Sequence, residues 1–160
     1  MDSAAAVLKF KVNYEQTKHL AIGNAVHSDE ISAGGHTWRI NCYPRGNATF
    51  GNGEHLAIFV ELMSKSRIVK AAIEVVLMDK GRETSSNAAK CLAGVHLFQM
   101  NDDSFGWSMF VRKTDLVKDY VTNGQIAFIT RRNNLVPSYI NINAADAIHQ
   151  ISRYYGDCAN

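Results

Sequence analysis

The chain has 160 residues, of which 46% are hydrophobic and 20% are charged, a composition typical of ordinary globular proteins. This length predicts one main domain that buries roughly two-thirds of the surface of the unfolded chain. The net charge of +2 is too small to indicate a nucleic-acid-binding surface, and the basic residues occur mostly singly or in pairs. No apolar window approaches the length of a membrane span. We therefore expect neither nucleic acid nor a membrane as a partner.

The start of the chain and its cysteines predict where the protein resides. Residues 1–6 carry an acid where a secretory signal needs basic residues. The three cysteines, Cys42, Cys91 and Cys158, are widely spaced and form no C-x-x-C pair. An odd number of such cysteines is typical of free thiols in a reducing compartment. The sequence therefore predicts a protein of the nucleus, the cytoplasm or both.

Short segments of alternating apolar and polar residues follow one another along the chain and predict β-strands. A helical turn over residues 15–20 follows the first strand, and a second turn, capped by Thr114, precedes the hairpin signal Asn123-Gly124. The strand segments are 8–14, 26–31, 37–42, 55–63, 69–78, 92–99, 105–111 and 125–130. Seven or eight short strands with little helix predict an all-β fold, an antiparallel sandwich.

The core of this sandwich is expected around the strand that contains Trp38. Two glycines precede the strand and Pro44 follows it, while Trp38, Ile40 and Cys42 share one face of the extended segment. A tryptophan supplies more buried apolar area than any other side chain. The pattern therefore predicts that Trp38 is a structural residue on which the other strands pack.

The last part of the chain departs from the strand pattern. Ala144, Ile148 and Ile151 recur at helical spacing, with Asn143 as N-cap and Gly156 as C-cap. We therefore expect a domain over residues 1–134 and an extension over residues 135–160 that contains a short helix. This helix either packs on the sandwich or pairs with a second copy to form a homodimer.

Six histidines raise the question of a metal or catalytic site. They form no H-x-x-x-H or H-E-x-x-H motif, and none stands at zinc-ligand spacing from a cysteine. The nucleophile elbow, the P-loop and the dinucleotide fingerprint are absent from the sequence. The adjacent acids Asp102-Asp103 lie in a polar loop, where carboxylates are usually solvated. The sequence therefore predicts no enzyme, no catalytic residue, no metal and no cofactor.

Several aromatic side chains occupy positions that the predicted core does not account for. Phe59 lies on the polar face of its strand, His96 shares a face with Phe98, and Phe105 and Trp107 flank a glycine beside a polar loop. Each of them taken alone is best interpreted as part of the core. Together they favour a shallow, aromatic-walled groove that binds an extended peptide.

Three stretches of the sequence carry a resemblance to a known family. They are Gly34-Gly35-His36-Thr37-Trp38-Arg39-Ile40-Asn41-Cys42-Tyr43-Pro44-Arg45-Gly46, Leu56-Ala57-Ile58-Phe59-Val60-Glu61-Leu62 and Phe105-Gly106-Trp107-Ser108-Met109-Phe110-Val111-Arg112. With Tyr14 and Thr17-Lys18 before Gly23, these closely resemble a MATH (meprin and TRAF homology) domain. The version is that of plant, particularly grass, proteins that join a MATH to a BTB/POZ domain. The likeness runs from about Val7 to Thr130.

This resemblance implies an eight-stranded antiparallel TRAF-like sandwich and a peptide-binding role. In MATH-BTB adaptors, the MATH domain holds an extended, serine- and threonine-rich degron, while the BTB domain recruits a cullin scaffold for ubiquitination. The site implied by matching positions comprises Phe59, Ile73, His96, Asp103, Ser104, Phe105, Gly106 and Trp107. His96 and Ile73 replace aromatic residues of the animal speckle-type adaptor, and Asp102-Asp103-Ser104 stand where that adaptor carries a lysine.

Two functions remain open at the level of the sequence. In the first, the chain recognises substrates for a ubiquitin ligase, through a BTB-containing adaptor and a cullin that bind outside residues 1–160. In the second, it is a MATH-only interaction protein that dimerises with full adaptors or competes with them, and recruits no ligase. A BTB segment downstream of Asn160 in the native protein distinguishes the first from the second.

Overall fold

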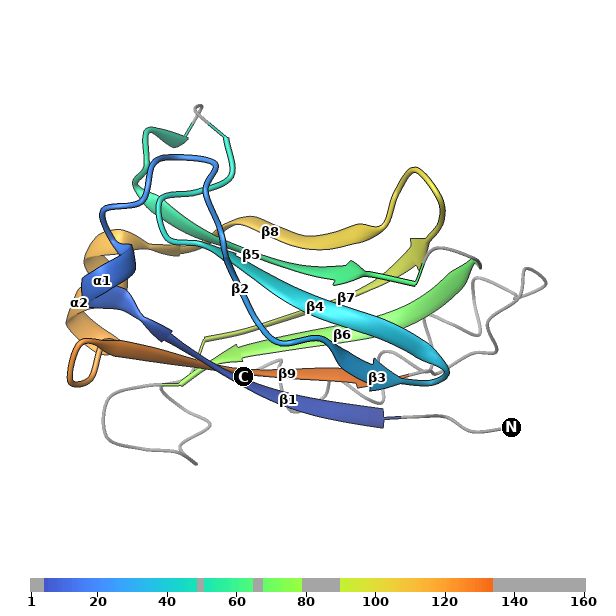
Figure 1. Cartoon of the computed structure of the whole chain (residues 1–160). Helices are drawn as coiled ribbons and strands as arrows, with labels where there is room; N and C mark the ends of the chain where they lie inside the picture. Colours follow the sequence, from blue (N-terminus) through green and yellow to red (C-terminus); the bar gives the residue numbers. More distant parts are fainter. Residues whose placement is uncertain (1–4, 49–50, 65–67, 79–89, 134–160) are drawn as a thin grey trace.

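The computed structural model describes residues 5–48, 51–64, 68–78 and 90–133, and these form a sandwich of two antiparallel β-sheets (Figure 1). The four-stranded sheet has the order β1 (Ala5–Asn13), β9 (Gln125–Asn133), β6 (Val69–Leu77) and β7 (Lys90–Phe98). The second sheet has the order β2 (Val26–His27), β4 (His36–Tyr43), β5 (His55–Leu62) and β8 (Ser104–Arg112), with β3 (Ile31–Ala33) also paired to β4. The predicted antiparallel sandwich is confirmed.

One predicted strand, over residues 26–31, is divided into the two short strands β2 and β3. The side chain of Ser28 causes the interruption, because its Oγ accepts a hydrogen bond from Ile40 N at 2.8 Å. The backbone N–H of Ser28 meanwhile donates to Ile40 O at 2.9 Å. Since a hydroxyl replaces a backbone acceptor, the ladder to β4 breaks there. The described part of the chain therefore contains nine strands rather than eight.

Two short helices lie together at one end of the sandwich (Figure 1). Helix α1 (Tyr14–Thr17) is capped by Asn13, whose Oδ1 accepts from Gln16 N at 3.1 Å. Helix α2 (Lys113–Asp119) buries Leu116, but its N-cap is Arg112. The predicted cap at Thr114 is therefore wrong, because helical geometry already begins one residue before it.

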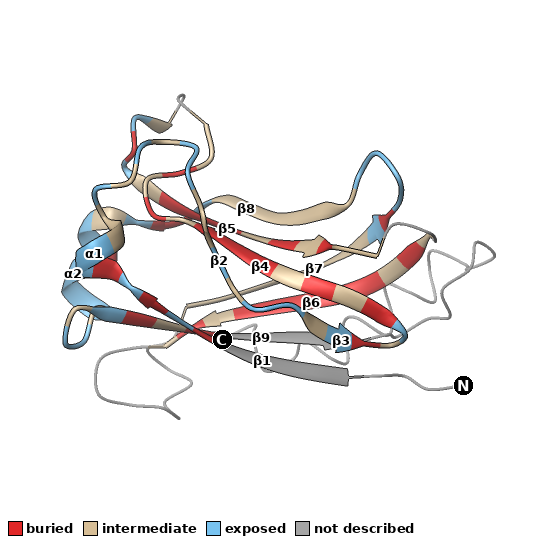
Figure 2. Cartoon of the chain, in the orientation of Figure 1, coloured by how far each residue is buried: buried red, intermediate tan, exposed pale blue. Residues whose placement is uncertain are grey.

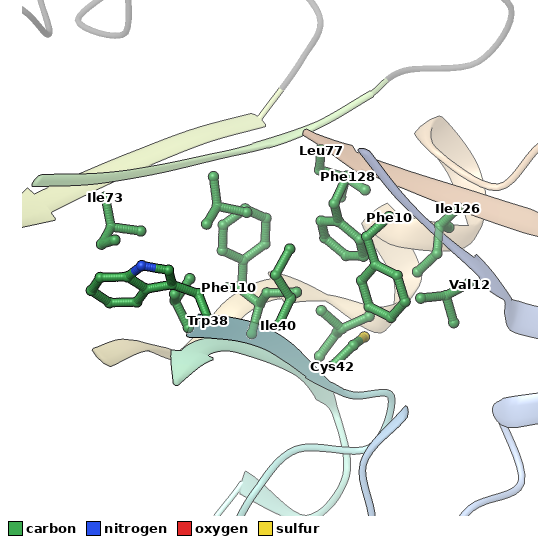
Figure 3. Close-up of a cluster of buried hydrophobic side chains, with 14 of the residues drawn as sticks. Phe10, Val12, Trp38, Ile40, Cys42, Ile73, Leu77, Phe110, Ile126 and Phe128 are labelled. Atoms are coloured by element: carbon green, nitrogen blue, oxygen red, sulfur yellow. The ribbon is translucent and has the colours of Figure 1, made fainter. Parts of the chain in front are cut away.

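Trp38 lies in the core, as its strand pattern predicts. Its exposed fraction is 2%, and Ile40 and Cys42 on the same face of β4 are equally buried (Figures 2 and 3). The indole Nε1 donates to Ala33 O at 3.1 Å, so its polar atom is satisfied within the core. Its ring meets Phe98 of the opposite sheet edge to face, with 5.1 Å between centroids. The contact joins the two sheets.

The cysteines differ from one another. Cys42 is free and fully buried, and burial raises the pKa of its thiol far above the ordinary value. Cys91 is disulfide-bonded. The prediction of free thiols is therefore correct for Cys42 and wrong for Cys91, while Cys158 lies outside the described residues.

Other expectations fall on parts of the chain that are not described. The C-terminal helix over residues 144–155, the extension 135–160 and the homodimer through that helix all lie there and stay predictions. In the described ranges, no helix has both the length and the apolar character needed to cross a membrane.

Replacing Trp38 with alanine should destabilise the domain by about 3–5 kcal/mol, because it removes the largest buried side chain and leaves a cavity between the sheets. Urea denaturation followed by circular dichroism measures the change in the free energy of unfolding. Met109→Ala is the matched control, since Met109 is 58% exposed and its truncation should have little effect. A Trp38→Ala midpoint equal to that of the wild type would contradict the core assignment.

Candidate functional site

The candidate site lies on the side of the sandwich where the edge strands β7 and β8 run next to each other. Among the described strands, β7 pairs only with β6, and β8 pairs only with β5. Each is therefore the edge strand of its own sheet, and the two edges lie on the same side of the molecule (Figure 1). Edge strands present unpaired backbone N–H and C=O groups to a ligand.

A continuous row of aromatic rings spans the gap between these two edges. His96 of β7 stacks on Phe105 of β8, with centroids 5.0 Å apart and planes within 17°. Phe105 contacts Trp107 at 5.4 Å. We define the aromatic row as these three partly exposed residues together with the buried rings that they touch, Phe98 beside His96 and Phe110 beside Trp107. Phe105 and Trp107 also pack against the core.

Gly94 makes room for this row. A Cβ atom built on Gly94 would lie 2.6 Å from Cζ of Phe105, so the Phe105 ring rests directly on the backbone of β7. A glycine inside a strand often marks such a close approach. Gly94 was not among the predicted site residues, although its position within a predicted strand was the available signal. Opposite Gly94 on β6 stands Ile73, which is fully buried and offers no surface to a ligand.

The strand register separates Phe59 from the aromatic row. Phe59 pairs with Gly106 of β8, whereas the neighbouring residues of β5, Ile58 and Val60, are buried and pair with Trp107 and Phe105. Because side chains alternate across a strand, Phe59 lies on the outer face of the sheet and the aromatic row on its inner face. The predicted site residues of β5 and β8 therefore lie on two faces of the sheet, with Phe59 on the outer face and Phe105 and Trp107 on the inner face.

Gly106 has no space for a side chain. A Cβ atom there would collide with the carbonyl oxygen of Ile58 and lie 2.6 Å from Cα of Phe59. The two strands also change register between Leu56 and Ile58. Such irregularities re-aim side chains and are frequent beside binding sites.

The outer face around Phe59 carries a network of polar side chains. Glu61 Oε1 accepts from Arg39 and from Asn41, each at 2.8 Å. The ring of Tyr43 packs edge to face against Phe59, with 5.9 Å between centroids. Burial, and to a smaller extent the negative charge of Glu61, raises the pKa of the Tyr43 phenol. Phe59 is thereby held in a defined orientation.

The hairpin between β7 and β8 places negative charge at one end of the aromatic row. Gln99 and Asp102 exchange two backbone hydrogen bonds of 3.0 Å, and Leu62 N donates to Asp103 O at 2.7 Å. The Asp102 carboxylate lies 3.1 Å from His96 Nε2, close enough for an ion pair when His96 is protonated, although its geometry is not that of a hydrogen bond. Ser104, the first residue of β8, pairs with Glu61.

The side chains of the candidate site define the contacts that it can make. In the ranges that the structure describes, no group of three histidine, cysteine, aspartate or glutamate side chains stands ready for a metal ion. What the site offers is aromatic surface, two strand edges that no other described strand pairs with, and a small acidic hairpin. A β-sandwich with these features belongs to the class of protein-interaction domains.

Comparison with known proteins identifies the family. The family model of the MATH domain matches residues 9–129. The chain therefore belongs to the MATH domain family, and the resemblance found in the sequence is confirmed.

The similar curated proteins come from a plant. The chain is 30% identical over 114 residues to BTB/POZ and MATH domain-containing protein 5 of Arabidopsis thaliana. It is 29% identical over 114 residues to protein 6 of the same series and 28% identical over 116 residues to protein 4. The matches cover 68%, 68% and 66% of this chain, but only 28%, 28% and 25% of those relatives.

A Gly106→Ala variant should be less stable by about 1–3 kcal/mol, because the added methyl group meets backbone atoms of β5 that have nowhere to move. Gly51→Ala is the matched control, since a Cβ atom at Gly51 meets nothing within 4 Å. Chemical denaturation of both variants checks the expectation. Equal loss of stability in the two would show that the close approach of β5 and β8 has no cost.

Proposed function

We propose that the domain binds an extended segment of a partner protein along the edge of β8 that no described strand pairs with. The observation that carries this proposal is the aromatic row, which opens at a strand edge instead of being sealed inside the sandwich. A peptide added as a further strand pairs its backbone with β8, and every second side chain then meets the row. The predicted site residues His96, Phe105 and Trp107 hold those side chains.

The alternation of an added strand gives Phe59 a role in the same complex. Side chains between those that meet the aromatic row turn to the outer face of the sheet. There Phe59, which lies opposite Gly106 of β8, presents a partly exposed ring to them. The two faces of the sheet thus contact alternate residues of one peptide. Ser104 and Asp103 contact the end of the peptide that lies near the hairpin.

We further propose that the bound segments are serine- and threonine-rich degrons and that the protein acts as a substrate adaptor of a cullin-based ubiquitin ligase. The support is the similarity to proteins whose names combine a BTB/POZ and a MATH domain. The alternative is an interaction protein that pairs or competes with such adaptors and recruits no ligase. On either account, we expect the protein in the nucleus, the cytoplasm or both.

The peptide site is tested with an array of extended peptides. Trp107→Ala should weaken binding by about 2 kcal/mol or more, because truncation of a central aromatic anchor has costs of this size. Met109→Ala is the control on the same strand, since its side chain is exposed and lies outside the aromatic row. If folded Trp107→Ala protein binds every wild-type ligand equally well, the site is misplaced.

The acidic hairpin should set a charge preference. Wild-type protein should favour peptides with lysine or arginine near Asp102 and Asp103 and disfavour acidic or phosphorylated residues there. The double variant Asp102→Lys/Asp103→Lys should reverse this order on the same array. An unchanged preference would remove the hairpin from the recognition surface without affecting the role of Trp107.

The adaptor role is tested with the native gene product. If a BTB segment follows Asn160, affinity capture of the full protein should retain a cullin, and deletion of that segment should abolish the capture while peptide binding persists. A native product that binds peptides but retains no cullin would instead favour the interaction protein without ligase recruitment.

A further inference from the structure

An open cavity lies at the end of β8 opposite the acidic hairpin. Its volume is about 830 Å³. The loop before β5, the last residue of β8 and the first turn of α2 form its walls, and its principal lining residues are Arg45, Asn52, Glu54, Arg112, Lys113 and Thr114. In Figure 1, α2 and the hairpin between β7 and β8 lie at opposite ends of the sandwich. The cavity is therefore separate from the aromatic row.

The charges around this cavity are not balanced. Arg45, Arg112 and Lys113 line it together with one carboxylate, Glu54. Within the described residues, none of the three cations has a carboxylate oxygen within 4.0 Å, whereas Arg39 has Glu61 at 2.8 Å. Three cationic residues beside one carboxylate leave a net positive charge on this concave surface, which attracts anions.

The walls of the cavity are fixed by backbone contacts. The guanidinium of Arg45 lies across Gly53, so that a Cβ atom there would stand 3.1 Å from Nε and 3.2 Å from Nη2. Gly53 has a φ of +72°, which glycine adopts without strain. The backbone N–H of Lys113 donates to Glu54 O at 2.7 Å and ties α2 to the opposite wall. These contacts hold Arg45 against one wall of the cavity and the first turn of α2, with Lys113, against the other.

We propose that this cavity binds a phosphate monoester dianion carried on a phosphorylated side chain of a protein segment. Guanidinium groups bind phosphate oxygens through two parallel hydrogen bonds, and two of them with a lysine suit a doubly charged group. The volume exceeds that of one phosphate ion and accommodates the residues to which it is attached. The proposal does not depend on the aromatic row, since the two sites share no residue.

The test uses the whole chain and a pool of hexapeptides with one central phosphoserine, beside an identical pool with serine. Fluorescence polarisation should show that the phosphorylated pool binds at least about tenfold more tightly and that its binding weakens with added salt. Arg45→Gln and Arg112→Gln should each weaken it by about tenfold. Lys118→Gln is the control, because Lys118 is exposed on α2 and does not line the cavity.

Each result that contradicts the proposal points to a different explanation. Equal binding of the two pools, or unchanged binding by folded Arg112→Gln protein, would overturn the proposal. Complete displacement of the phosphopeptides by an equal concentration of inorganic phosphate would show that the cavity takes free phosphate instead. Loss of phosphopeptide binding in Trp107→Ala would place the ligand on the aromatic row, whereas retained binding supports a separate site even if the proposed peptide groove fails.

Discussion

The contact between Trp38 and Phe98 is the interaction on which the rest of the structure depends. Trp38 belongs to β4 of the five-stranded sheet and Phe98 to β7 of the four-stranded sheet, so their edge-to-face packing at 5.1 Å spans the core. The hydrogen bond from the indole to Ala33 O removes the cost of burying its N–H group. Large aromatic area and a satisfied polar atom together allow the two sheets to pack closely at this position.

The candidate site continues this core outward. From Phe98 the ring contacts pass to His96, then to Phe105 and Trp107, while exposure increases from fully buried to partly exposed. The proposed ligand-binding surface is therefore held by the same packing that stabilises the domain. A rigid aromatic surface of this kind loses little conformational entropy on binding. The candidate site and the core of the domain therefore share aromatic rings.

Strand β8 joins the two regions of interest and gives them opposite charge. It begins next to Asp102 and Asp103, and it ends at Arg112, next to Lys113 of α2 and beside the cavity that Arg45 also lines. Between these ends, Phe105 and Trp107 face the inside of the sandwich. The irregular pairing with β5 then interrupts the alternation of side chains along β8, so that the consecutive residues Phe110 and Val111 are both buried. One strand therefore carries an apolar surface and two charged ends.

The sequence by itself determined the class of fold and much of its local structure. The period of two around Trp38 predicted its burial, and Asn123-Gly124 predicted a turn in which both residues now have positive φ values. It also placed Phe59 on the polar face of its strand, because that conclusion needs only the neighbouring residues of β5. These features depend on residues a few positions apart.

The tertiary structure alone decided which of the predicted site residues meet. The packing of the two sheets brings His96 onto Phe105. The pairing of β5 with β8 places Phe59 on the opposite face of the sheet, beside Gly106. The cavity beside Arg45 and Arg112 likewise joins residues far apart in the chain. Alternation fixes the two faces of one strand, but register and sheet packing arise from contacts between distant segments, which no local pattern contains.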